Sequence, residues 1–201
     1  CEELLKRYWD DTRIMHISGT RWNPEFDIGP YSYIFSQYAH IWGWATWKRA
    51  WQTYDYKITS WKKIREQIKD YIVFKSKAEE RRWFNNWDKI SADPDYKNAW
   101  SFQWQYNIYM NNGLCINPKE NLISNIGSEG TRSNKDNSKN PYLYKEIDEK
   151  YNIAIHPTII APNILFDKYH LKNHIEPMLR RRNVFKRIMN KISRIASARN
   201  K

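Results

Sequence analysis

The chain has 201 residues, of which 41% are hydrophobic and 16% aromatic, so it is not a disordered chain and fits one globular domain. Its formal net charge of +12 is unevenly spread, because residues 180–201 hold nine Lys or Arg and no acid. The rest of the chain carries 25 bases against 22 acids, and this near-neutral body argues against a nucleic-acid-binding protein.

The first third of the chain predicts short elements. Helical spacing of apolar residues indicates a helix over residues 2–10, and β-rich stretches indicate strands over 13–18 and 31–35. Thr46 is a plausible N-cap for a helix whose aromatic face includes Trp47 and Trp51.

The middle of the chain is predicted to be mostly helical. Further helices are expected over 60–72, 76–90 and 101–112, with a turn at 91–95 and short strands over 114–116 and 122–124. Ser101 can cap the last of these helices, and Asn112-Gly113 is a typical helix end.

The C-terminal third begins with residues 127–141, which are rich in Gly, Ser, Asn and Lys and are predicted to form a loop. Residues 153–163 are expected to be extended. From about Ile175 the pattern indicates a basic amphipathic helix, which either lies on an anionic membrane surface or docks on the domain. We therefore divide the chain into a domain, 1–174, and a basic helical tail, 175–201.

Two cysteines, Cys1 and Cys115, form no disulfide framework, and no run of about 18 apolar residues is present. We expect a cytoplasmic protein, which the basic tail could place on the inner face of the membrane as a peripheral protein. A mature lipoprotein also begins with Cys, but here a helical pattern follows at once. We therefore expect the chain to be part of a longer protein.

Several short motifs in the sequence, which we call family-like phrases, occur together in one protein family. The most specific is His-Ile-Trp-Gly-Trp-Ala-Thr-Trp at 40–47, and the others are Cys-Glu-Glu-Leu-Leu at 1–5, Ile-Ser-Gly at 17–19, Trp100–Trp104, Asn112-Gly113-Leu114, Asn121–Gly127 and His156-Pro157. Over about residues 1–170 the chain resembles bacterial glycosyltransferases of the GT-A fold, also described as nucleotide-diphospho-sugar transferases.

The resemblance implies an α/β fold. The chain would be its C-terminal, acceptor-side part, mostly helices with a few short strands. Such an enzyme moves a sugar from a nucleotide-sugar donor to a glycan or lipid-linked acceptor in surface polysaccharide synthesis. The family's Asp-x-Asp motif holds Mn²⁺ or Mg²⁺ in the full-length enzyme. Here Asp93-Pro94-Asp95 lies in a polar turn, so we expect no metal bound by this chain alone.

The acceptor site is predicted from aromatic residues, because Trp rings pack against the C–H faces of sugars. Candidate acceptor-binding residues are Trp42, Gly43, Trp44, Gln103 and Trp104. The alternative for each is core packing, which is favoured for Trp47 and Trp51.

Candidates for the catalytic base are Asp88, Glu129 and Asp55, each with a surface acid as the alternative. The family often has Asp where this chain has Ser101, and His where it has Arg132. Arg132 and Asn125 are candidates for the donor loop.

The histidines are not expected to form a metal site. His170 and His174 have the i, i+4 spacing of a ligand pair, but no Glu follows His170 and no third ligand is evident. Two other functions stay open: a non-catalytic carbohydrate-binding module and a peripheral membrane-binding module.

Overall fold

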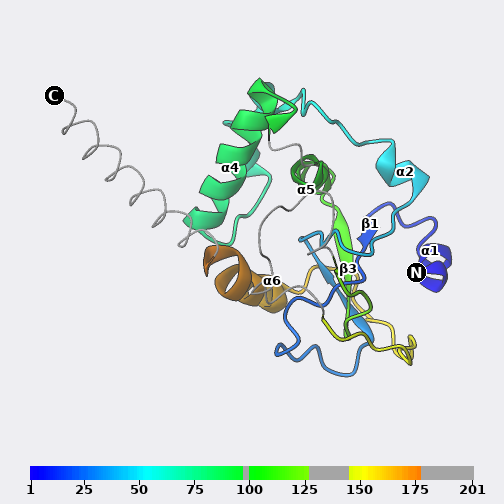
Figure 1. Ribbon diagram of the computed structural model, residues 1–201. Coiled ribbons are helices and arrows are strands. Elements are labelled where there is room, and N and C mark those ends of the chain that lie inside the picture. Colours follow the sequence, from blue (N-terminus) through cyan, green and yellow to red (C-terminus); the bar gives the residue numbers. More distant parts are fainter. Residues whose placement is uncertain (97–99, 127–144, 178–201) are drawn as a thin grey trace.

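The computed structural model describes residues 1–96, 100–126 and 145–177. This part of the chain is an α/β protein with six α-helices and a three-stranded mixed sheet (Figure 1). The strands β1 (Ile14–Ile17), β2 (Tyr33–Ser36) and β3 (Leu114–Pro118) lie in the order β1-β3-β2. The central strand β3 runs parallel to β1 and antiparallel to β2.

Both faces of the sheet are covered, so every strand residue is buried. On one face, Leu4 of helix α1 (Glu2–Arg7) and the following Tyr8 pack with alternate strand residues such as Ile14, Phe35 and Ile116. On the other face lie α5 (Ser101–Met110) and α6 (Ile164–His170). Trp104 and Ile108 of α5 pack with Met15 and Cys115, and Phe166 of α6 packs with Ile34.

A second core joins the helices in the middle of the chain. These are α3 (Trp61–Ile64), the short 3₁₀ helix η1 (Ile68–Asp70), α4 (Lys77–Ala92) and α5. Helices α4 and α5 pack against each other through Trp83, Trp87, Tyr106 and Tyr109 (Figure 1). A short helix, α2 (Lys48–Trp51), precedes this region, and a π-helical turn, η3 (Leu171–Ile175), continues α6.

The three strands expected over 13–18, 31–35 and 114–116 are confirmed, as are the helices expected over 76–90 and 101–112. The helix expected over 60–72 is instead divided into α3 and η1. The strand expected over 122–124 is wrong. Leu122 N–H donates to the carbonyl of Gly19, and Ile123 packs on Gly43, so this segment crosses the edge of the sheet instead of extending it.

Both predicted caps are wrong. Thr46 does not cap α2, because its hydroxyl donates to the carbonyl of Met15 at 2.6 Å, and Trp47 is the N-cap residue. Trp100, with no side-chain cap, precedes α5, so Ser101 is its first helical residue. Residues 127–144 and the basic tail from 178 onward lie outside the described residues.

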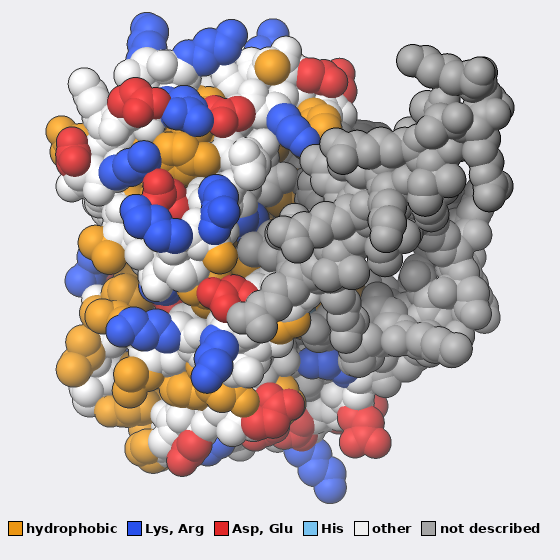
Figure 2. Space-filling model, turned by 90° about the vertical axis from the view of Figure 1, so that its left-hand side faces the viewer, with side chains coloured by type: hydrophobic (Ala, Val, Ile, Leu, Met, Phe, Trp, Pro, Cys, Tyr) orange, Lys and Arg blue, Asp and Glu red, His pale blue; other side chains and the backbone are white. Residues whose placement is uncertain are grey.

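The surface of the described body mixes both signs of charge. On the face in Figure 2, Lys and Arg side chains are interspersed with Asp and Glu, with apolar side chains between them. No helix within 1–96, 100–126 or 145–177 is long and apolar enough to cross a membrane.

Candidate functional site

The carboxyl ends of the parallel strands β1 and β3 meet at one edge of the sheet, where ligand sites of open α/β folds usually lie. Residues 18–23 leave β1 here, and residues 119–125 leave β3. Asn121 ties the segments together. Its Oδ1 accepts from the backbone N–H of Arg21 at 3.1 Å, and its Nδ2 donates to the carbonyls of Ile123 and Glu146, each at 2.8 Å.

A pocket of about 620 Å³ opens at this edge, and we call it the carboxyl-edge pocket. It is lined by Arg21, Pro24, Glu120, Asn121, Lys145, Glu146, Ile147 and Asp148. The three acidic side chains are exposed, whereas Arg21 is buried and Lys145 partly so. The Lys145 ammonium donates to the carbonyl of Arg21 at 2.8 Å and lies 5.5 Å from the ring centre of Trp22.

Arg21 is the unusual member of this pocket, because its side chain is only 2% exposed. Its Nη2 donates to the carbonyl of Phe26 at 2.6 Å, and the guanidinium lies 5.4 Å from the ring centre of Phe166. Nε and Nη1 find no hydrogen-bond acceptor among the described residues. Burial lowers the pKa of Arg21, but a guanidinium keeps its charge in proteins.

Beside Arg21 lies a cluster of aromatic and imidazole rings. Trp22 lies 4.9 Å from Trp42, 5.7 Å from His40 and 4.5 Å from His174, measured between ring centres. His170 stacks on His174 at 4.8 Å. Trp22 and Trp42 are only partly buried, so their rings can offer an apolar surface to a ligand.

The four buried or partly buried imidazoles, His16, His40, His170 and His174, form what we call the histidine cluster. Nε2 of His40 lies 3.4 Å from Nε2 of His170, whose Nδ1 lies 2.8 Å from the Asn23 amide nitrogen. Burial lowers the pKa of all four, to about 4 for His16 and His174. At neutral pH the cluster is therefore uncharged and cannot supply cations to a site.

Of the predicted acceptor residues, Trp42, Gly43 and Trp44 lie near this edge. The Trp42 carbonyl accepts from the Thr20 hydroxyl at 3.0 Å. Gly43 has a φ of 56°, and the space where a side chain would stand is taken by Ile123. Its missing side chain thus makes room for Ile123.

The other two predicted acceptor residues, Gln103 and Trp104, are fully buried on α5 and do not line the carboxyl-edge pocket. The Trp104 indole N–H donates to Nδ1 of His16 at 3.2 Å, and Gln103 donates to the Pro94 carbonyl at 3.4 Å. Trp44 is partly buried and stacks between His16 and Trp100.

Both described candidates for the base hold other partners. The Asp88 carboxylate accepts from Arg65 at 2.7 Å and from the Trp61 indole at 2.9 Å, and the Arg65 guanidinium lowers its pKa. Asp55 accepts from the backbone and hydroxyl of Thr59 in a tight turn. Glu129 and Arg132 lie outside the described residues. Asn125 is partly buried on the segment that follows β3.

The residues described here do not fit a divalent metal. Among 1–96, 100–126 and 145–177, no three His, Cys, Asp or Glu side chains are arranged to hold one. No chemical step is therefore assigned to a metal in this part of the chain.

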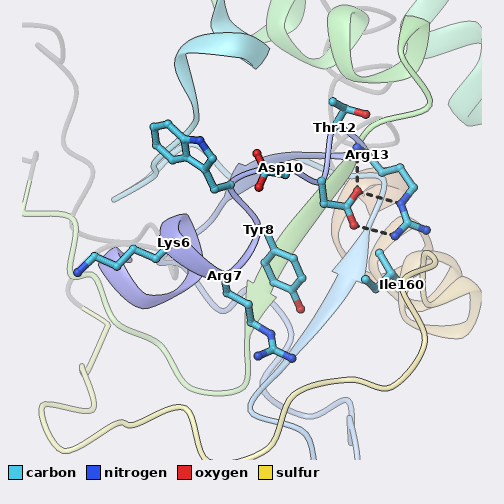
Figure 3. A pocket seen from close by; sticks show the side chains of 9 residues that line it. Lys6, Arg7, Tyr8, Asp10, Thr12, Arg13 and Ile160 are labelled. Carbon is cyan, nitrogen blue, oxygen red and sulfur yellow. Dashed lines mark hydrogen bonds and ion pairs between the residues drawn. The ribbon is translucent and has the colours of Figure 1, made fainter.

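A second pocket, of about 830 Å³, lies at the opposite, amino end of β1. Figure 3 shows Lys6, Arg7 and Arg13 around it. The Asp11 carboxylate accepts two hydrogen bonds from the Arg13 guanidinium, at 2.7 and 2.9 Å. The loops at this end precede the strand, and none of the residues that line this pocket belongs to a family-like phrase, so we do not assign the chemistry here.

No family model, curated protein or solved structure matches the chain.

Arg21, Trp22, Asn121 and Lys145 were not among the candidate site residues predicted from the sequence, although Asn121 begins the family-like phrase at 121–127. A signal for three of them was present, because Arg21 and Trp22 come shortly after the predicted strand at 13–18, and Asn121 comes shortly after the one at 114–116. Lys145 could not be found this way, since it comes to the pocket from the far side of residues 127–144.

Proposed function

We propose that the chain forms the acceptor side of a glycosyltransferase, which moves a sugar from a nucleotide-sugar donor to a glycan or lipid-linked acceptor. One observation carries the proposal. Three of the family-like phrases, at 17–19, 40–47 and 121–127, are far apart in sequence but their described residues meet at the carboxyl edge. Ile17 pairs with Ala45, Gly19 accepts from Leu122, and Ile123 packs on Gly43.

The contribution of this edge to the reaction is positioning. Holding an acceptor hydroxyl in place lowers the entropic part of the barrier to transfer. The rings of Trp22 and Trp42 can pack against a sugar face, and the exposed acids of the carboxyl-edge pocket can accept hydrogen bonds from hydroxyl groups. The donor's leaving group is not assigned to any described residue.

Calorimetry of the purified chain tests the proposal, with a panel of bacterial surface oligosaccharides and, separately, nucleotide-sugars with Mn²⁺. We expect heat from at least one oligosaccharide and none from the donors. Trp22→Ala should weaken oligosaccharide binding about 10-fold or more, by loss of its ring face. Trp9→Ala is the matched control, because Trp9 is 66% exposed in the opposite pocket. Donor binding, or no glycan binding at all, contradicts the proposal.

A non-catalytic carbohydrate-binding module is the second candidate. It is favoured by the pairing of Asp88 with Arg65 and of Asp55 with Thr59, which leaves neither described candidate base ready to take a proton. Sugar transfer by a longer protein that contains this chain would favour the glycosyltransferase over the binding module. Glycan binding without transfer would decide for the module.

A further inference from the structure

We propose that the carboxyl-edge pocket binds an acidic sugar, and that Arg21 recognises its carboxylate. The inference rests on the proposed function in one respect, since the acidic sugar would belong to the acceptor glycan. It narrows the acceptor to glycans that carry a hexuronic acid or a similar monoanionic residue.

The argument begins with the cost of burying a charge. An isolated cation is rarely buried without an anion, because it loses its hydration. Arg21 is 2% exposed, and none of the described acids lies within ion-pair distance of it. Two of its nitrogens, Nε and Nη1, have no acceptor among the described residues. A buried water can accept a hydrogen bond but cannot neutralise the charge.

The guanidinium is also held in place before any ligand arrives. Nη2 is fixed on the carbonyl of Phe26, and one face lies against the ring of Phe166. The backbone of Arg21 is fixed in turn, because its N–H donates to Asn121 and its carbonyl accepts from Lys145. A donor group with few conformations left to lose is suited to binding, since less entropy is lost when the ligand binds.

The charges around the pocket select the kind of anion. Arg21 and Lys145 supply two positive charges, whereas Glu120, Glu146 and Asp148 supply three negative ones at the exposed wall. A dianionic phosphate would be repelled by these acids. A monoanionic carboxylate is repelled less, and if it belongs to a sugar, the neighbouring hydroxyls can donate to the acids.

The aromatic neighbour is consistent with a sugar ring. Trp22 follows Arg21 directly, is partly buried and lies under the Lys145 ammonium. Trp22 does not line the pocket, but its partly buried indole ring lies beside Arg21 and Lys145, where the apolar face of a bound sugar could contact it.

Thermal unfolding with small probes tests the proposal. D-glucuronate, D-glucose and inorganic phosphate would be compared at equal ionic strength, set with sodium chloride. At a glucuronate concentration about ten times its Kd, binding stabilises the fold by about 1.4 kcal/mol, so we expect Tm to rise by about 3–6 °C. Glucose and phosphate should raise it less. An equal rise with glucose, or a larger rise with phosphate, overturns the proposal.

Substitutions of Arg21 complete the test. Arg21→Met should abolish the advantage of glucuronate over glucose and should change Tm little in the absence of ligand, because the lost hydrogen bond to Phe26 is offset by removal of a buried charge with no described acid within ion-pair distance. Arg21→Lys should keep a smaller advantage. Arg81→Met, an exposed site on α4, is the matched control and should respond as the unsubstituted chain does. If Arg21→Met keeps the full glucuronate response, the assignment to Arg21 fails.

The design separates this inference from the proposed function. If neutral oligosaccharides bind in calorimetry while glucuronate shows no advantage, only the acidic-sugar inference fails. If Arg21→Met does not fold, the probe comparison on the unsubstituted chain and on Arg21→Lys still decides between the outcomes.

Discussion

The buried imidazoles determine, at the scale of single residues, how the fold should respond to acid. Burial lowers the pKa of His16 from about 6.5 to about 4, and the other members of the histidine cluster shift in the same direction. As pH falls below about 6.5, the unfolded chain binds protons that the folded chain refuses. The contribution that the neutral histidines make to the free energy of unfolding is therefore fully present above about pH 6.5 and is lost as pH falls from there to about 4.

We predict that the free energy of unfolding, measured with urea, decreases steadily from pH 7 to pH 4.5. His16 alone should account for about 2 kcal/mol of this decrease, because each unit of pKa shift is worth about 1.4 kcal/mol and the effect of the shift is not complete at pH 4.5. His16→Gln should reduce the slope. The paired carboxylates titrate in a lower window, since the pKa of Asp88 is below its usual value. Equal stability at pH 7 and 4.5 would contradict this prediction.

Gly43 gives a second prediction at this scale. In Gly43→Ala the new Cβ would collide with Ile123 at a positive φ, so we expect a loss of more than about 2 kcal/mol of stability. In an Ile123→Ala background the same change should cost about 1–2 kcal/mol, because the backbone strain and the 3.1 Å contact with the Cβ of residue 123 remain, whereas the closer contacts with Cγ1 and Cδ1 do not. Urea unfolding measures both.

The matched control is Gly29→Ala. Gly29 also has a positive φ, of 72°, but nothing lies within 4 Å of the added Cβ. It should therefore cost about 1 kcal/mol, from strain alone. A Gly43→Ala variant no less stable than Gly29→Ala would show that Ile123 moves aside freely.

At the scale of elements, α4 has a side-chain cap, whereas α5 has none. The Ser76 hydroxyl oxygen accepts from the backbone N–H of Glu79 at 3.1 Å. We predict that Ser76→Ala lowers the free energy of unfolding by about 1 kcal/mol. Ser101→Ala should change it by less than about 0.5 kcal/mol, since Ser101 does not cap α5. Equal losses of stability in the two variants would contradict the prediction that Ser76 caps its helix and Ser101 does not.

The sequence predicted elements well where local pattern decides them. The strands and the longer helices follow apolar spacing, so their positions were found within a few residues. The role of Thr46 and the conformation of residues 122–124 were predicted wrongly, because hydrogen bonds to residues far away in the sequence determine both. Thr46 bonds with Met15, and Leu122 bonds with Gly19, about 30 and 100 positions away along the chain. Local propensity carries no information on such pairs.

The candidate site shows the same limit. The sequence indicated the phrase at 40–47 and the residues near it, and the structure brings Trp42 and Trp44 to the carboxyl edge. The sequence left core packing open as the alternative for Gln103 and Trp104, and could not decide between the two, because α5 is buried on most sides and its buried residues include polar ones such as Gln105 and Asn107. The unpaired guanidinium of Arg21 was also out of reach, since burial and missing partners are properties of the folded chain.

For the whole molecule, charge is the clearest feature. Deleting residues 180–201 changes the net charge from +12 to +3. If the tail binds anionic membranes, we predict that vesicles containing phosphatidylserine retain the full chain at least 10-fold better than the shortened one. The difference should shrink as salt rises. Vesicle binding that survives the deletion would contradict a membrane role for the tail.

The order of the strands has a consequence for how the chain is made. The central strand β3 is the last of the three to be synthesised, and within the three-stranded sheet β1 and β2 are each neighbours of β3 alone. At about 5–20 residues per second, β1 leaves the ribosome some 5–20 seconds before its partner is translated. During that interval its apolar residues have no sheet to join. Chaperones that hold nascent chains should therefore engage this protein before residue 114 is exposed, and a slowly translated stretch before β3 would lengthen that dependence.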